Sequence, residues 1–254
     1  MTQITLIGGP TALIDIDGFT VVTDPTFDAP GEYPIPGGVL VKQSGPAIAA
    51  SDLPALDAIV LSHSHHPDNL DTSGAALLPS AAKVLGTSMA AEQFSLVTAL
   101  EPWQSVSLTG ANGKDVTVTA VPARHGPVGC EEITGIVTGF VIESAGAGTI
   151  YISGDNAALE LVDEIAARFP NVSVAVLFTG AARVGLFDNA PLTLTAEMAV
   201  EAATKLKGAT IFPVHSEGWA HFSEDRDLLV AAFDKAGLGD RLLLVAPGAS
   251  VTVS

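Results

Sequence analysis

Histidine and aspartate residues follow closely behind runs of β-forming residues at four separate points of this chain. The runs IVLS, TVTAV, IYISG and IFPV precede His63, His125, Asp155 and His215, respectively. A side chain at the end of a strand is fixed by the rigid sheet and faces the cleft at the edge of that sheet, where binding sites form. The pattern therefore predicts a protein built on sheets, with one polar site at the strand ends.

The spacing within the first histidine cluster favours metal binding. His63 and His65 lie two residues apart on an extended segment, so their side chains project to the same side, and Asp68 follows in the next turn. Imidazole and carboxylate ligands together suit Zn²⁺, with Mn²⁺ and Fe²⁺ as alternatives. A bridging carboxylate such as Asp155 can hold two cations roughly 3.5–4 Å apart. We therefore expect one or two divalent metal ions per chain.

Several polar residues near these positions have more than one interpretation. His66 and Asn69 are less certain metal ligands than their neighbours. Asp155 could instead cap the helix that is expected to begin near Ala157, which is a common use of aspartate. Asp24 is interpreted as a turn-former or as a hydrogen-bond partner of a ligand histidine, rather than as a ligand.

Short β runs dominate the pattern of the chain. The first strands are expected at Ile4–Ile7, Ala12–Ile16 and Thr20–Thr23, with a hairpin turn at Asp17-Gly18. The stretch from Phe27 to Pro46 is rich in glycine and proline and is predicted to be a long loop. Further strands are expected at Ala58–Ser62, Lys83–Gly86, Val116–Val121, Val137–Glu143, Thr149–Ile152, Val174–Phe178, Thr210–Pro213 and Leu242–Val245.

Helical spacing of apolar residues appears between the later strands. It predicts helices over Ala157–Phe169, from Thr195 as N-cap to about Leu206, and from about Arg226 to Ala236. Hairpins early in the chain and alternating strands and helices later indicate an α+β protein in which helices cover sheets. Since no linker or low-complexity tract divides the chain, we expect a single domain over residues 1–254.

The chain is strongly acidic, which disfavours nucleic acid as a partner. Its 28 acidic and 11 basic residues give a net charge of −17, which repels a phosphate backbone. No apolar stretch approaches the eighteen residues of a transmembrane helix, and the N-terminus lacks the features of a signal peptide. The single cysteine, Cys130, suits a reducing compartment. We expect a cytoplasmic protein that acts on a small molecule, and its assembly into homo-oligomers is left open.

The ordered motifs resemble the signature of metallo-β-lactamase-fold hydrolases. They are His63-x-His65-x-x-Asp68, a single His125, Ser153-Gly154-Asp155 and Pro213-Val214-His215. The segments HPDNLD and EGWAHF are most similar to an uncharacterised bacterial branch, itself similar to the ascorbate-6-phosphate lactonase group. The resemblance covers essentially the whole chain. It implies an αββα four-layer sandwich, in which two mixed sheets are flanked by helices and the metals lie at the edge between the sheets.

The resemblance also implies a role for each ligand. The first metal would be held by His63, His65 and His125, the second by Asp68 and His215, and Asp155 would bridge the two. One position departs from the family pattern, because Asn69 stands where a histidine follows the aspartate. An amide oxygen is a weaker ligand than an imidazole for a borderline metal, so His66 or His221 would have to compensate, or a harder ion such as Mn²⁺ would be preferred.

The expected activity is metal-dependent hydrolysis of a small-molecule ester, lactone or phosphoester by a metal-activated water. Asp68 would orient this water or accept its proton, and His221 would contact the substrate or transfer a proton. Two alternatives stay open. One is a catalytically weak metal-binding or sensor protein of the same fold, which Asn69 favours, and the other is a di-iron redox enzyme.

Overall fold

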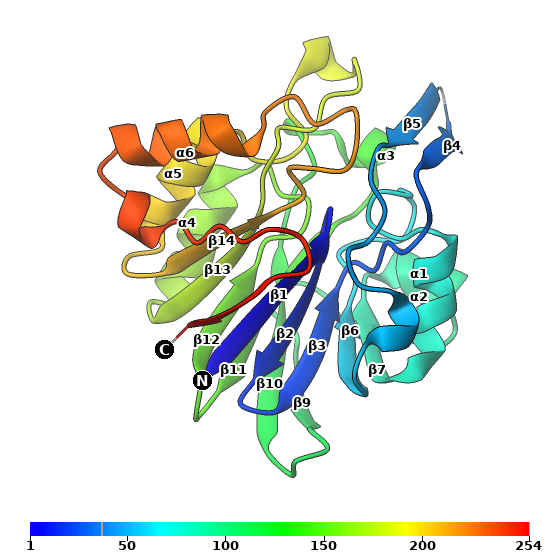
Figure 1. Ribbon diagram of the computed structural model, residues 1–254, viewed down its shortest axis with the longest axis vertical. Coiled ribbons are helices and arrows are strands. Elements are labelled where there is room, and N and C mark those ends of the chain that lie inside the picture. Colours follow the sequence, from blue (N-terminus) through cyan, green and yellow to red (C-terminus); the bar gives the residue numbers. More distant parts are fainter. Residues whose placement is uncertain (37, 254) are drawn as a thin grey trace.

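Two β-sheets pack face to face at the centre of the protein (Figure 1). The computed structural model describes residues 1–36 and 38–253. The first sheet has the strand order β15-β1-β2-β3-β6-β7-β8. Its strands are β1 (Thr2–Gly8), β2 (Thr11–Ile16), β3 (Phe19–Thr23), β6 (Leu56–Val60), β7 (Ala81–Gly86), β8 (Val97–Ala99) and β15 (Ser250–Val253). Neighbours from β15 to β3 are antiparallel, whereas β3, β6, β7 and β8 are parallel.

The second sheet has the strand order β14-β13-β12-β11-β10-β9. Its strands are β9 (Ser105–Thr109), β10 (Asp115–Pro122), β11 (Thr138–Ser144), β12 (Gly148–Ile152), β13 (Val172–Phe178) and β14 (Thr210–Val214). The strands from β9 to β12 are antiparallel, and β12, β13 and β14 are parallel. Both sheets are therefore mixed, as expected.

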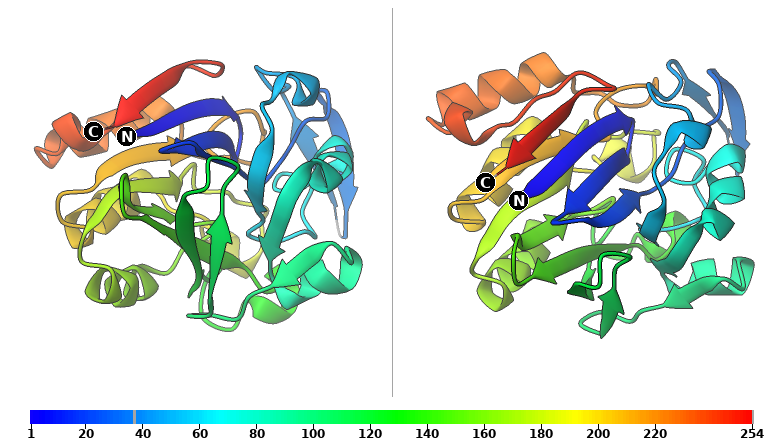
Figure 2. Two further views of the ribbon diagram at one scale, coloured as in Figure 1. Left: turned by 90° about the horizontal axis from the view of Figure 1, so that it is seen from below. Right: turned by 60° about the horizontal axis from the view of Figure 1, so that its bottom comes forward.

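Helices cover the outer face of each sheet, as the views in Figure 2 show. The first sheet is covered by α1 (Thr72–Leu77) and α2 (Ser88–Gln93), and the second by α4 (Leu159–Arg168), α5 (Ala196–Lys205) and α6 (Arg226–Lys235). The main core lies between the sheets and contains alternate residues of their strands, such as Val116, Val118 and Ala120 of β10. This arrangement confirms the predicted αββα sandwich. No helix among the described residues has the length and apolar character needed to cross a bilayer.

Helix boundaries follow local capping chemistry. The Thr195 side chain accepts a hydrogen bond from the backbone of Met198, so it caps α5 as predicted, and Asp225 caps α6 in the same way. The N-cap residue of α4 is Ala158, and no side chain caps this helix. Asp155 is therefore not a helix cap, and the capping interpretation of this residue was wrong.

The predicted loop from Phe27 to Pro46 contains a β-hairpin, which corrects the expectation. Strands β4 (Gly31–Ile35) and β5 (Gly38–Lys42) pair in an antiparallel ribbon that is separate from both sheets. Residues 30–38 include three prolines and three glycines, which is a composition typical of loops. Its strands form because Lys42 pairs with Trp219 and because Leu40 is buried.

Three further differences concern short elements. The segment Leu242–Val245 is not a strand, since only Leu242 forms an isolated bridge to Ile211 of β14. The short strands β8, β9 and β15 were not predicted. Neither were α1, α2 and the single-turn helix α3 (Glu131–Thr134). These elements have three to six residues, too few for hydrophobic periodicity to reveal them.

Candidate metal centre

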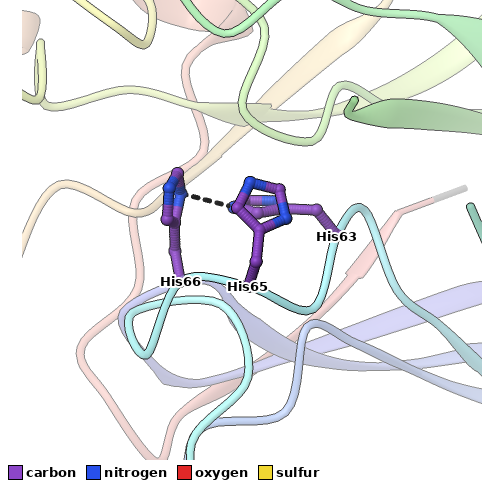
Figure 3. Close-up of side chains that lie close together, drawn as sticks. All are labelled: His63, His65 and His66. Carbon is purple, nitrogen blue, oxygen red and sulfur yellow. Dashed lines mark hydrogen bonds between the residues drawn. The ribbon is translucent and has the colours of Figure 1, made fainter. Parts of the chain in front are cut away.

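Three histidines lie on the loop that follows β6. Figure 3 shows the rings of His63, His65 and His66 side by side, all extending from one loop toward the second sheet. The His63 Nε2 and His66 Nδ1 atoms are 2.9 Å apart, and the ring centroids of His65 and His66 are 4.2 Å apart. The same three residues offer ligand atoms that lie within 4.8 Å of one another. His66 thus belongs to the same cluster as His63 and His65.

The orientation of His65 is fixed by a backbone carbonyl. Its Nε2 atom lies 2.7 Å from the carbonyl oxygen of Thr134, at the end of α3, and donates to it. The opposite ring nitrogen, Nδ1, is buried and has no hydrogen-bond partner among the described residues. Gly135 permits this contact, because a Cβ atom at that position would lie 2.3 Å from His65 Nε2. Such a bond sets the tautomer and leaves the other nitrogen free to bind a metal.

His125 and Asp155 meet on the second sheet. His125 follows β10, and its Nδ1 atom lies 2.8 Å from the carbonyl oxygen of Leu192, which orients the ring as Thr134 orients His65. The free Nε2 atom is 3.5 Å from Oδ2 of Asp155, which follows β12. Together with His63, these two residues form a group of buried ligand atoms within 4.8 Å of one another.

A second group shares the same aspartate. Asp68, Asp155 and His215 offer ligand atoms within 4.8 Å of one another, and all three side chains are buried. His215 Nε2 is 3.3 Å from Asp68 Oδ2, and its Nδ1 is 3.6 Å from Asp155 Oδ1. His221 Nε2 lies 3.0 Å from the same Asp68 oxygen. Asp155 therefore stands between the two groups, where a bridging ligand is expected.

The side-chain amide of Asn69 donates hydrogen bonds to two carboxylates. Its Nδ2 atom donates to Asp155 Oδ1 at 3.1 Å and to Asp24 Oδ2 at 3.4 Å. Asp24 also accepts a 2.6 Å hydrogen bond from the backbone nitrogen of Ser62, so it fixes the end of β6. Burial raises the pKa of Asp24 to about 7, and the nearby charge of Asp155 adds to the increase. Among the described residues, Asp24 therefore accepts hydrogen bonds from the Asn69 side-chain amide and from the Ser62 backbone, and not from a histidine side chain.

The protonation states of the first histidine cluster and of Asp68 suit metal binding. Burial lowers the pKa of His63 and His65, and it lowers that of His66 to about 3, with the neighbouring imidazoles adding to the effect. Burial raises the pKa of Asp68, but the hydrogen bond from His221 and the nearby His221 and His215 rings outweigh it and hold the pKa well below 3.8. Neutral imidazoles and an ionised carboxylate are the forms that bind a metal ion. His215 differs, because burial lowers its pKa but the charges of Asp155 and Asp68 outweigh burial and raise it, so a metal ion would have to displace a proton there.

Unpaired buried atoms show that the residues fit a cation. Among the described residues, no hydrogen-bond partner exists for His65 Nδ1, Asp155 Oδ2 or either ring nitrogen of His215. Leaving such atoms buried and unpaired costs free energy, and a bound cation would satisfy them. All six residues predicted as ligands, together with His66, Asn69 and His221, meet at this centre.

Sequence reasoning missed the residues that support the centre. Asp71 caps α1 and also accepts hydrogen bonds from the backbone of Phe27 and Asp28, and from Lys42 Nζ at 2.9 Å. The Lys42–Asp71 pair is buried and ties the β4–β5 hairpin to the loop that carries the histidines. The orienting groups of Thr134 and Leu192 are backbone carbonyls, which every residue possesses, so no sequence signal identifies them.

Comparisons with known proteins agree with this architecture. A model of the beta-lactamase superfamily domain matches residues 20–216. A UPF0173 metal-dependent hydrolase of Myxococcus xanthus (strain DK1622) is 29% identical over 211 residues, which are 78% of this chain and 69% of the relative. The structure of a possible metal-dependent hydrolase from Veillonella parvula DSM 2008 has a TM-score of 0.86 at 20% identity and covers 100% of both chains. An isothiocyanate hydrolase from Delia radicum gut bacteria has a TM-score of 0.82 at 22% identity over 99% of each chain.

An αββα sandwich with clustered histidines and aspartates at the edge between its sheets defines the class of metallo-β-lactamase-fold proteins. Because the family model covers more than half of it, this chain belongs to the beta-lactamase superfamily. The expected family and fold are confirmed. The Myxococcus xanthus relative is named a metal-dependent hydrolase, in agreement with the predicted enzyme class. The two structural neighbours, at 20% and 22% identity, support the fold alone.

Proposed function

We propose that this protein hydrolyses a small-molecule ester, lactone or phosphoester with the help of one or two divalent metal ions. One observation carries the proposal: two groups of buried ligand atoms share Asp155. The proposed ligands are His63, His65 and His125 for the first ion, Asp68 and His215 for the second, and Asp155 for both. Nitrogen and oxygen donors in this combination favour Zn²⁺, with Mn²⁺ and Fe²⁺ as alternatives. A divalent cation in such a site acidifies water and polarises the bond to be cleaved.

Asp68 is the proposed proton acceptor. It lines the pocket above the centre, and its Oδ2 atom is placed by His221 Nε2 at 3.0 Å and by His215 Nε2 at 3.3 Å. A carboxylate held in this way can orient an attacking water and accept its proton. His221 lines the same pocket, and its Nδ1 atom has no hydrogen-bond partner among the described residues. The His221 ring is therefore the proposed substrate contact or proton-transfer group.

The cellular setting is part of the proposal. Cys130 is a buried free thiol, which suits a reducing cytoplasm. A net charge of −17 supports a small-molecule substrate over a nucleic acid.

The decisive experiment combines elemental analysis with activity measurements. We expect one or two equivalents of zinc, manganese or iron per chain, and activity on at least one lactone, ester or phosphodiester. Chelation should abolish this activity, and adding the metal back should restore it. Asp155→Asn should lower the activity by at least about 10²-fold, since it weakens both groups of ligands.

The control is Asp163→Asn, because Asp163 lies on the surface of α4 and, among the described residues, forms an ion pair only with Lys205 of α5. This variant should keep full activity. Full activity in a protein freed of metal would contradict the proposal. Bound iron with visible absorption and no hydrolysis would favour the redox alternative, and metal binding without any turnover would favour the sensor alternative.

A further inference from the structure

The pocket above the metal centre is divided into a polar floor and an apolar wall. Its volume is about 270 Å³. The floor consists of histidine and aspartate side chains of the centre, including His65, Asp68 and His221. The apolar wall comes from three separate parts of the chain and contains Ile35, Leu40, Ile133, Val184, Leu186 and Leu192. We use the term apolar wall for these six residues.

The apolar wall offers no positive charge to an anionic substrate. Among residues 1–36 and 38–253, no lysine or arginine lines the pocket. The basic residues on the surrounding loops are engaged elsewhere. Lys42 pairs with the buried Asp71, Arg124 pairs with Glu160, and Arg183 donates to the Asn189 carbonyl and to Ser223 Oγ. A substrate that carries a phosphate or carboxylate away from the reacting bond would find no counter-charge there.

Part of the apolar wall is exposed to water. The side chain of Ile133 is 60% exposed, and those of Val184 and Leu186 are 38% and 39% exposed. A single exposed apolar residue needs no explanation, but several from different loops around one pocket indicate a ligand surface. Contact with a hydrocarbon group would remove these side chains from water, which is favourable in proportion to the apolar area buried.

We propose that the apolar wall binds an uncharged alkyl or aryl group of the substrate. This inference rests on the proposed hydrolase function and narrows its substrate class to neutral, apolar esters and lactones. In the reaction, the acyl–oxygen bond breaks, the oxygen of water bonds to the acyl carbon, and the departing alkoxide oxygen takes up a proton. The apolar group remains in contact with the apolar wall throughout.

The first test compares p-nitrophenyl esters that differ only in the tail. The neutral series runs from acetate to hexanoate, and each added methylene should raise kcat/KM by about threefold to fourfold until the wall is covered. Two charged tails match hexanoate in length, namely the monoester of adipate and the ester of 6-aminohexanoate. Both should react at least about tenfold more slowly than hexanoate, since a charge would be buried without a partner.

A binding measurement separates this inference from the proposed function. The same neutral and charged tails are attached to a hydroxamate, a group that chelates metal ions, and binding to the metal-loaded protein is measured by calorimetry. The order of affinities should match the order of the esters. If the hydroxamates follow this order while no ester is hydrolysed, the hydrolase proposal fails and the inference about the apolar wall stands.

Substitutions in the wall test its position. Ile133→Lys should reduce the preference for hexanoate over the adipate monoester by at least about tenfold, and Val184→Lys serves as a second variant in case the first does not fold. The control is Leu228→Lys, which changes a side chain of α6 that is 52% exposed and remote from the pocket, and it should keep the wild-type preference. Equal rates or affinities for neutral and charged tails, or a preference for the charged ones, would overturn the inference.

Discussion

His215 holds a backbone conformation that side chains rarely adopt. Its φ angle is +58°, in the left-handed region, where a residue with a Cβ atom loses roughly 1–2 kcal/mol relative to the right-handed region. The turn is stabilised by a 2.7 Å hydrogen bond from the His215 nitrogen to the carbonyl oxygen of Gly9. A non-glycine residue in this region at a polar centre suggests that its side chain is retained for function at a cost in stability.

This cost can be measured with two variants of the metal-free protein. We expect His215→Gly to be about 1 kcal/mol more stable than His215→Ala, because only glycine adopts this φ without strain. Urea denaturation in the presence of a chelator measures the difference. Ser216 has no positive φ, so the matched pair Ser216→Gly and Ser216→Ala should show the opposite order. An alanine variant at position 215 as stable as the glycine variant would refute the strain argument.

Gly135 offers a test of how the His65 ring is positioned. In Gly135→Ala, the new methyl group would collide with His65 Nε2 and break its bond to Thr134, so we expect the metal affinity to fall by about 10–100-fold. Metal titration against a competing chelator measures the effect. The control is Gly129→Ala, since Gly129 also has a positive φ (85°) but has no atom near its Cβ position. Equal metal affinity in the two variants would contradict this role.

At the level of single residues, the sequence indicated which side chains lie together at the candidate centre, but it did not indicate which groups orient them. His63, His125, Asp155 and His215 were predictable because they follow β runs, and a sheet brings such positions to one edge. The identity of the groups that orient them depends on which backbone carbonyl lies nearby in space. The double contact of Asn69 with Asp24 and Asp155 also depends on tertiary structure.

At the level of elements, the β4–β5 hairpin explains why local patterns were insufficient. Its composition is that of a loop, and it forms through tertiary contacts that local sequence does not encode. The backbone of Gln43 donates to the Gly218 carbonyl, and Ala220 donates to Val41. The hairpin thus joins the segment that carries His221 to the histidine loop, which makes it part of the pocket.

The stability of the contact between the segment before β4 and helix α1 should depend on pH through Asp28. Burial raises the pKa of Asp28, but hydrogen bonds from Ser73 and Thr72 outweigh it and hold the pKa below 3.8. The resulting stabilisation is present above pH 3.8 and is lost as the pH falls through the lower pKa of the folded state. Asp28→Asn should therefore lower the free energy of unfolding by about 1 kcal/mol at pH 7 and by less below pH 4.

Denaturation curves from pH 3 to pH 7 measure this dependence. The control is Asp188→Asn, since the exposed Asp188 side chain accepts no hydrogen bond from any described residue. The control should show no comparable loss at pH 7. A difference between Asp28→Asn and wild type that stays constant over this range would rule out the carboxylate as its source.

At the level of the whole molecule, the proposed ligands come from both sheets. His63 and Asp68 follow a strand of the first sheet, whereas His125, Asp155 and His215 follow strands of the second. We expect metal at about 100 times its dissociation constant to stabilise the fold by about 2.7 kcal/mol, which corresponds to an increase in Tm of about 5–10 °C for a chain of this size. Thermal unfolding with and without chelator measures this increase, which Asp155→Asn should largely abolish.

The four-layer architecture was predictable because the order of strands and helices along the chain agrees with the way in which the strands pair in the two sheets. Hairpins early in the chain and the β–α alternation after Thr149 match the antiparallel and parallel parts of the sheets. The return of the chain to the first sheet was not predictable, because β15 has only four residues and pairs with β1 across the full length of the sequence. A pairing of such sequence separation leaves no local signature.

This pairing has a practical consequence for anyone who handles the protein. Thr2 of β1 lies opposite Val253 of β15, and Figure 1 marks both ends of the chain near the start of β1. Gly9, whose carbonyl oxygen accepts the hydrogen bond from His215, follows the other end of this strand. Thr2 and Gly8 are the first and last residues of the seven-residue strand β1, which is about 20 Å long. An affinity tag, fluorophore or immobilising surface attached at either terminus should therefore lie remote from the candidate metal centre.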